Sequence, residues 1–190
     1  MVEPTRSPLG PQVLEELGNL LLRQARELDW GVVGQLAQQL DHARRVLLFG
    51  AGRSGSTALA FAQRLNHVGV DAAVVGESTN RRIGEGDVVI VVSGSGATAS
   101  AVTIATEAKA TGCQVVAISS TRSSSLALLA DVVVELKARS KGQRDDVTQS
   151  PYTAQFDVSV FALSEVVGAL LLERRQLADV DIEKWRPNVE

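Results

Sequence analysis

The sequence predicts an α/β protein with a doubly wound, parallel sheet of five strands flanked by helices. Short apolar runs alternate along the chain with helical segments and Gly-rich turns, as expected for strands that are buried on both faces and joined by crossover helices. Two of these runs end in a Gly- and Ser-rich turn that leads directly into a helix. The 190 residues suffice for one compact domain, and because aromatic residues are only 4% of the chain, Val, Leu, Ile and Ala must build its core.

Two N-terminal helices are predicted ahead of the sheet. Residues 1–11 contain three prolines and a glycine, which predict a flexible leader, so that residues 12–190 form a single domain. Apolar residues then recur at helical spacing over residues 13–28 and 30–43. We expect these two helices to serve packing or subunit contact.

The alternating part of the chain follows in order. Strands are predicted at residues 46–49, 72–75, 87–92, 114–119 and 132–136, and helices at residues 57–68, 99–111 and 123–130. Residues 137–150 form a polar loop of mixed charge, long enough to be functional, and whether it closes over a site is left open. The helix predicted at residues 156–172 is apolar around most of its circumference, which favours burial in a core or an interface.

The turn Ser93–Thr98 is the most informative feature for function. It lies between an apolar strand and a helix, and it holds three hydroxyl side chains and two glycines. Backbone N–H groups at a helix N-terminus have no intrahelical partner, and the helix dipole favours negative charge there. We therefore expect Ser93, Ser95 and Thr98 to bind a phosphate or another small anion.

A second turn, Gly50–Gly55, fits the pattern G-x-G-x-x-G. With Glu77 at the end of the next strand, it allows the alternative interpretation of a dinucleotide-binding fold. A second anion-binding turn at Ser93 favours instead a small phosphorylated ligand held between two strand ends. Gly52 and Ser54 would then face the rest of that ligand.

Several other polar residues allow two interpretations each. His67 either caps the C-terminus of its helix or transfers a proton, and Asp157 either matches the helix dipole or carries chemistry. The hydroxyl side chains of residues 119–121 form either a satisfied turn or a third polar patch at the same sheet edge. Cys113 is expected to be a buried thiol.

Composition excludes several classes of partner. The net charge is −3 with no stripe of Lys and Arg, so nucleic acid is not expected as a partner. No run of about 18 apolar residues or signal peptide is found, so we expect no membrane span and a cytoplasmic location. No Cys/His cluster has metal-ligand spacing, so we expect no metal site.

These residues together resemble the sugar isomerase (SIS) domain family, whose members bind phosphosugars on a five-stranded parallel sheet. Ser93, Ser95 and Thr98 match the family's Ser-x-Ser-x-x-Thr phosphate-binding loop. The resemblance is closer still to the 6-phospho-3-hexuloisomerases. It rests on the glycine-rich turn, the phosphate loop and four further segments, in order, at residues 64–69, 76–77, 83–87 and 129–134.

The resemblance implies a metal- and cofactor-free isomerase that interconverts 3-hexulose 6-phosphate and fructose 6-phosphate through an enediol, as in formaldehyde fixation by the ribulose monophosphate pathway. It implies that Asp157 is the base, and that His67 assists from a neighbouring subunit of a homotetramer or dimer. The chain departs from the family at residues 153–157, where it reads Thr-Ala-Gln-Phe-Asp instead of Gly-Ser/Thr-x-Phe-Glu. An isomerase of another sugar phosphate and a non-catalytic phosphosugar sensor are the alternatives.

Overall fold

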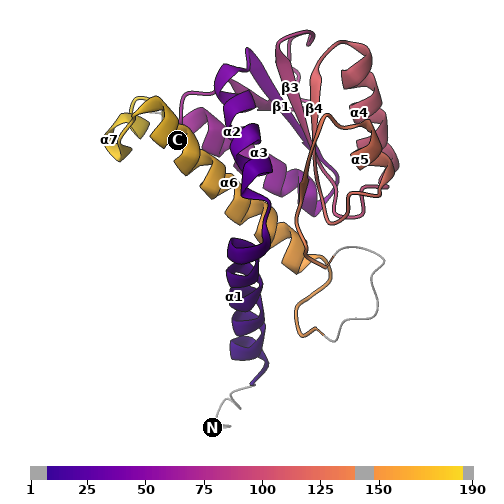
Figure 1. Cartoon of the computed structure of the whole chain (residues 1–190). Coiled ribbons are helices and arrows are strands. Elements are labelled where there is room, and N and C mark those ends of the chain that lie inside the picture. Colours follow the sequence, from indigo (N-terminus) through magenta and orange to yellow (C-terminus); the bar gives the residue numbers. More distant parts are fainter. Residues whose placement is uncertain (1–7, 140–147, 186–190) are drawn as a thin grey trace.

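A computed structural model describes residues 8–139 and 148–185, which form one layered α/β unit (Figure 1). Its five strands form a single sheet in the order β2-β1-β3-β4-β5, with every neighbouring pair parallel. The strands are β1 (Arg45–Gly50), β2 (Ala72–Val74), β3 (Asp87–Val92), β4 (Gln114–Ser119) and β5 (Val132–Glu135). The predicted α/β fold is confirmed. Each strand begins and ends within one residue of its predicted bounds.

Helices cover both faces of the sheet (Figure 1). One face packs against α2 (Trp30–His42), α3 (Arg53–His67) and α6 (Ala154–Arg175), and the other against α4 (Ala99–Ala110) and α5 (Ser125–Leu129). The long helix α1 (Leu9–Glu27) projects from this body and contacts α6, and the short α7 (Asp179–Ile182) follows α6.

Strand β3 shows how the apolar runs build the core. All six of its residues are buried, and successive side chains point to opposite faces. Val88, Ile90 and Val92 pack in the cluster with α2, α3 and α6, whereas Val89 and Val91 pack in the cluster with α4 and α5. An unbroken run of branched apolar residues is therefore what a central strand of this sheet requires.

Helices α1 and α3 begin about one turn earlier than predicted. Helix α1 starts at Leu9, inside the predicted leader, because Pro11 lies in its first turn, where a missing N–H breaks no hydrogen bond. Helix α3 starts at Arg53 instead of residue 57, so the second half of the glycine-rich turn is already helical. The rest of the leader, residues 1–7, and residues 140–147 of the predicted polar loop lie outside the described residues.

Helix α6 is longer at both ends than predicted and is one of the central helices of the fold. It is long and apolar enough to cross a membrane by those criteria alone, yet half of its most apolar stretch is buried inside this structure. Its buried residues pack against α2 and α3. Phe161, on its outer side, is exposed.

The strand order fixes where a ligand can bind. The chain leaves β1 for β2 on one side of it and then returns for β3 on the other, and this reversal opens a crevice beyond the carboxyl ends of β1 and β3. Gly50 and Val92, the last residues of these strands, are paired in register. The turns that follow them, at Ala51 and Ser93, therefore lie side by side, as expected from the sequence.

Candidate functional site

A cavity of about 400 Å³ lies at this crevice, within the size range of small-ligand sites. Three chain segments line it: the turn into α3, the turn into α4 and the first residues of α6. Six of the seven predicted site residues line it, namely Gly52, Ser54, Ser93, Ser95, Thr98 and Asp157. The structure thus brings together residues that lie up to about a hundred positions apart in the sequence.

The phosphate loop is held by hydrogen bonds within itself and to strand β4. The backbone N–H of Ser93 donates to the Ile118 carbonyl at 3.0 Å, and the Ser93 hydroxyl donates to Thr98 Oγ1 at 3.2 Å. Gly96 has a φ of +60°, and a Cβ there would lie 2.0 Å from Ser124 Oγ. Only glycine fits this position, so the loop is shaped before any ligand arrives.

Three helix N-termini meet at the cavity. Thr98 precedes α4 without capping it through its side chain, and Gly52 precedes α3 with a φ of +59° and no atom within 4 Å of its absent Cβ. Helices α3 and α4 carry no acidic residue in their first turns. Unpaired N–H groups and three dipole ends therefore make this cavity favourable for an anion.

Asp157, in the first turn of α6, is the one carboxylate that lines this cavity. Its Oδ2 accepts hydrogen bonds from Arg53 Nε at 2.6 Å and from Thr153 Oγ1 at 3.1 Å. Its Oδ1 is buried and has no hydrogen-bond partner among the described residues. The side chain of Asp157 is 5% exposed, whereas that of Arg53 is 69% exposed. A buried carboxylate is therefore paired with a largely exposed cation.

Thr153 lies where the chain departs from the expected family pattern. It precedes α6 with a left-handed backbone, at a φ of +64°, which a β-branched residue rarely adopts. Its hydroxyl donates a hydrogen bond to the carboxylate of Asp157, four residues on.

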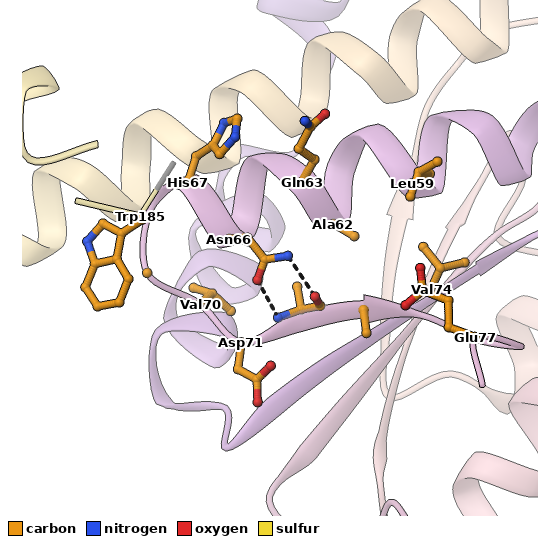
Figure 2. A pocket seen from close by; sticks show the side chains of 13 residues that line it. Leu59, Ala62, Gln63, Asn66, His67, Val70, Asp71, Val74, Glu77 and Trp185 are labelled. Carbon is orange, nitrogen blue, oxygen red and sulfur yellow. Dashed lines mark hydrogen bonds between the residues drawn. The ribbon is translucent and has the colours of Figure 1, made fainter. Parts of the chain in front are cut away.

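His67 lies at the other end of α3, about 20 Å along the helix axis from Arg53. It lines a separate cavity of about 690 Å³ together with Asn66, Trp185 and the edge strand β2 (Figure 2). Within one chain, His67 is therefore not brought to Asp157. Leu59 and Gln63, on the same helix, also line this second cavity (Figure 2).

The structure places the other polar residues that the sequence left with two interpretations. Ser119 is fully buried and donates to the Gly94 carbonyl at 3.3 Å, so it supports the phosphate loop without lining the cavity. Glu77, the carboxylate of the dinucleotide interpretation, lines the His67 cavity. Cys113 is a buried free thiol, as predicted. Among the described residues no group of three or more His, Cys, Asp or Glu could hold a metal ion.

Sequence reasoning missed Arg53 as a site residue. It had counted only as a polar residue in the glycine-rich turn, and its partner Asp157 is 104 positions away. Tyr152 and Phe156 also line the cavity. The only available signal for Arg53 was that it follows a glycine at a helix start.

The chain is similar to known proteins over most of its length. The sequence model of the SIS domain matches residues 39–156. The chain is 36% identical over 172 residues to an uncharacterized protein of Archaeoglobus fulgidus, covering 90% of this chain and 94% of the relative. It is 33% identical over 167 residues to a 3-hexulose-6-phosphate isomerase of Mycobacterium gastri, covering 87% and 84% respectively.

A solved structure has the same fold over nearly the whole chain. It is a hypothetical protein from Methanococcus jannaschii for which a function of 3-hexulose-6-phosphate isomerase was inferred. The two are 26% identical with a TM-score of 0.82, over 93% of this chain and 98% of the other.

Proposed function

The chain belongs to the SIS domain family, and from this premise we propose that it is a sugar-phosphate isomerase that interconverts 3-hexulose 6-phosphate and fructose 6-phosphate. One observation carries the proposal. The hydroxyl-bearing turn of Ser93, Ser95 and Thr98 and the buried carboxylate of Asp157 share one cavity of ligand size. The named relatives supply the choice of sugar.

The reaction is a proton shift in an open-chain ketose. A base takes the proton from C2 of the 3-ketose, which gives a 2,3-enediol, and returns it to C3, while the proton of the C2 hydroxyl passes to the oxygen on C3. The product carries its carbonyl at C2. Asp157 is the proposed base, because it is the carboxylate of the cavity, and the phosphate bound by Ser93, Ser95 and Thr98 fixes the sugar's position.

The ligand-free geometry requires Arg53 to move first. Asp157 Oδ2 already accepts two hydrogen bonds and Oδ1 is buried, so neither oxygen can meet a C–H group of the sugar. An incoming dianion attracts the exposed guanidinium of Arg53 away from the carboxylate. Once moved, Arg53 supplies positive charge toward the developing enediolate, where such charge accelerates the reaction most.

His67 enters the proposal only through a second subunit. Because His67 lies at the far end of α3 from Arg53, the partner of Asp157, His67 of one chain would assist in the cavity of a neighbour. Exposed apolar side chains support a homo-oligomer: Leu14 is 73% exposed, Leu22 59% and Leu59 55%. Leu59 lies two helical turns before His67, so the same α3 face would form the contact.

A phosphosugar sensor is the second candidate function. The covered carboxylate favours it, because a protein that only binds needs no accessible base. Both candidates predict binding of fructose 6-phosphate, but only the isomerase removes a proton from the bound sugar.

Solvent deuterium exchange distinguishes the candidates. We expect the purified full chain in D₂O to exchange the hydrogen on C3 of fructose 6-phosphate, observed by proton NMR, and Asp157→Asn to abolish exchange while the sugar still binds. Exchange at C1 instead would indicate an isomerase of another sugar phosphate. Binding without exchange would reject the isomerase and leave the sensor.

A further inference from the structure

A third hollow, of about 220 Å³, lies at the opposite edge of the sheet from Asp157. Its lining residues begin β1 and β3, precede β2, or belong to the segment that leads into β3. All of them are charged: Arg44, Arg45, Asp71, Arg81, Arg82 and Asp87. Four arginines around one hollow are notable in a chain whose net charge is −3.

One of the four arginines is already neutralised. Arg44 donates to both carboxylate oxygens of the buried Asp87, at 2.9 and 2.6 Å, and Asp87 also accepts the Gly84 N–H at 2.9 Å. The hydrogen bond from Arg44 lowers the pKa of Asp87 and raises that of Arg44. This pair is a structural clamp at the start of β3 and leaves Asp71 as the one carboxylate of the lining that faces the other three arginines.

Arg45 is held in place by one hydrogen bond, and two of its nitrogen atoms have no partner among the described residues. Its Nη2 donates to Asn80 Oδ1 at 3.1 Å, and Asn80 is itself fixed by donating to the Val74 carbonyl at 2.6 Å. The Nε and Nη1 of Arg45 are buried and have no hydrogen-bond partner among the described residues. Buried donors of a charged group are costly to leave unpaired, so they mark a place where an acceptor fits.

Arg81 and Arg82 add exposed charge to the same hollow. Both side chains are exposed, and neither forms an ion pair within residues 8–139 and 148–185. Setting aside the Arg44–Asp87 pair, Arg45, Arg81 and Arg82 face only Asp71, which leaves three positive charges against one negative, a surplus of two. A guanidinium is charged at all relevant pH values and matches phosphate with paired donors.

We propose that this hollow is a second anion site, which binds inorganic phosphate or the phosphoryl group of a larger metabolite. The surplus of two charges matches a phosphate dianion. The volume corresponds to about seven waters, which admits a phosphoryl group but not a whole sugar phosphate, so any carrier would extend into solvent. This site goes beyond the proposed function and does not depend on it.

Calorimetric titration of the full chain with inorganic phosphate tests the proposal. We expect two sites per chain, of which Ser93→Ala combined with Thr98→Val removes one. In that background Arg45→Gln should weaken the remaining site at least tenfold. Arg81→Gln combined with Arg82→Gln should weaken it similarly, and both residues are exposed, so this second variant avoids any folding defect. Arg26→Gln, an exposed arginine of α1, is the matched control and should leave the site unchanged.

The outcomes are separable from those of the isomerase proposal, because they do not involve turnover. Repeating the titration with fructose 6-phosphate in the same background distinguishes free phosphate from a phosphoryl carrier as the preferred source. Loss of all phosphate binding in the Ser93/Thr98 variant would overturn the second site. So would tight binding of single-stranded RNA, lost in the Arg81/Arg82 variant, without any binding of phosphate.

Discussion

Replacing Asp157 by Asn tests whether Arg53 moves from the carboxylate to the ligand. In the free protein the guanidinium is committed to Asp157, with Nε 2.6 Å from Oδ2. A ligand that recruits Arg53 must first break this contact. Asp157→Asn weakens the contact in advance, so we expect it to bind fructose 6-phosphate more tightly than the wild type does.

The magnitude follows from the burial of the pair. A shielded hydrogen bond to a charged group contributes about 1.5–3 kcal/mol, and an exposed ion pair about 0.2–1 kcal/mol. The side chains of Arg53 and Asp157 are 69% and 5% exposed, so this pair lies between the two cases. We estimate about 1 kcal/mol, which corresponds to about fivefold in the dissociation constant.

A double-mutant cycle measured by titration calorimetry isolates the contribution of Arg53. Removing the negative charge of Asp157 favours an anion even without Arg53, so Asp157→Asn is also measured in an Arg53→Gln background. We expect the gain to fall there to about twofold or less, since that background has no guanidinium to release. Equal gains in both backgrounds, or weaker binding by Asp157→Asn, would refute the movement of Arg53.

The chain supplies a matched control for this cycle. Arg64 and Glu165 also join α3 to α6, with 2.7 Å between Arg64 Nη2 and Glu165 Oε2, and neither lines the Asp157 cavity. Arg64→Gln should therefore leave the affinity for fructose 6-phosphate unchanged. A change as large as that of Arg53→Gln would mean that the effect comes from helix packing.

Three further predictions concern stability and binding. Gly96→Ala should lower the free energy of unfolding by about 2 kcal/mol or more in urea titrations, because its Cβ would collide with Ser124. Thr98→Val should weaken fructose 6-phosphate binding about tenfold by calorimetry, through the loss of one hydroxyl hydrogen bond to the phosphate. Glu16 should contribute stability that depends on pH: burial tends to raise its pKa, but hydrogen bonds from residues 148–150 and 155 outweigh this and lower the pKa from 4.5 to about 2. Its contribution is complete above the unfolded-state pKa and is lost as the pH falls from about 4.5 to 2, so Glu16→Gln should destabilise at pH 7 and make no difference near pH 2 in thermal melts.

The sequence predicts the sheet well because its strands are determined by local patterns. The unbroken apolar run of β3 can only be a strand buried on both faces, and the turns after β1 and β3 identify the crevice. Helix starts are harder, since Pro11 and Gly52 fit both a loop and the first turn of a helix. The predicted starts of α1 and α3 therefore lie four residues after the observed ones.

The chemistry of the site was less predictable than its location. The hydroxyls of the Ser93–Thr98 turn predict an anion site by type and spacing, so the location of the cavity could be found from the sequence. The contact between Arg53 and Asp157 joins two helix starts that only the folded sheet brings together. Spacing along the chain carries no information on such a pair, nor on the distance between His67 and Asp157.

The charge balance of the cavity gives Arg53 its significance. Arg53 pairs with the carboxylate that lies beside the predicted phosphate-binding loop, so the cavity presents no unpaired negative charge to an incoming phosphate. Under the proposed function the phosphate does not need Arg53 as its primary partner, because hydroxyls and the N-termini of α3 and α4 already supply neutral donors and dipoles. Arg53 is thus available for the reacting end of the sugar. A lysine in its place would keep the positive charge but lose the Nε–H group that donates to Oδ2 of Asp157. Arg53→Lys therefore separates two effects of Arg53: neutralising the charge of Asp157 and covering its oxygen.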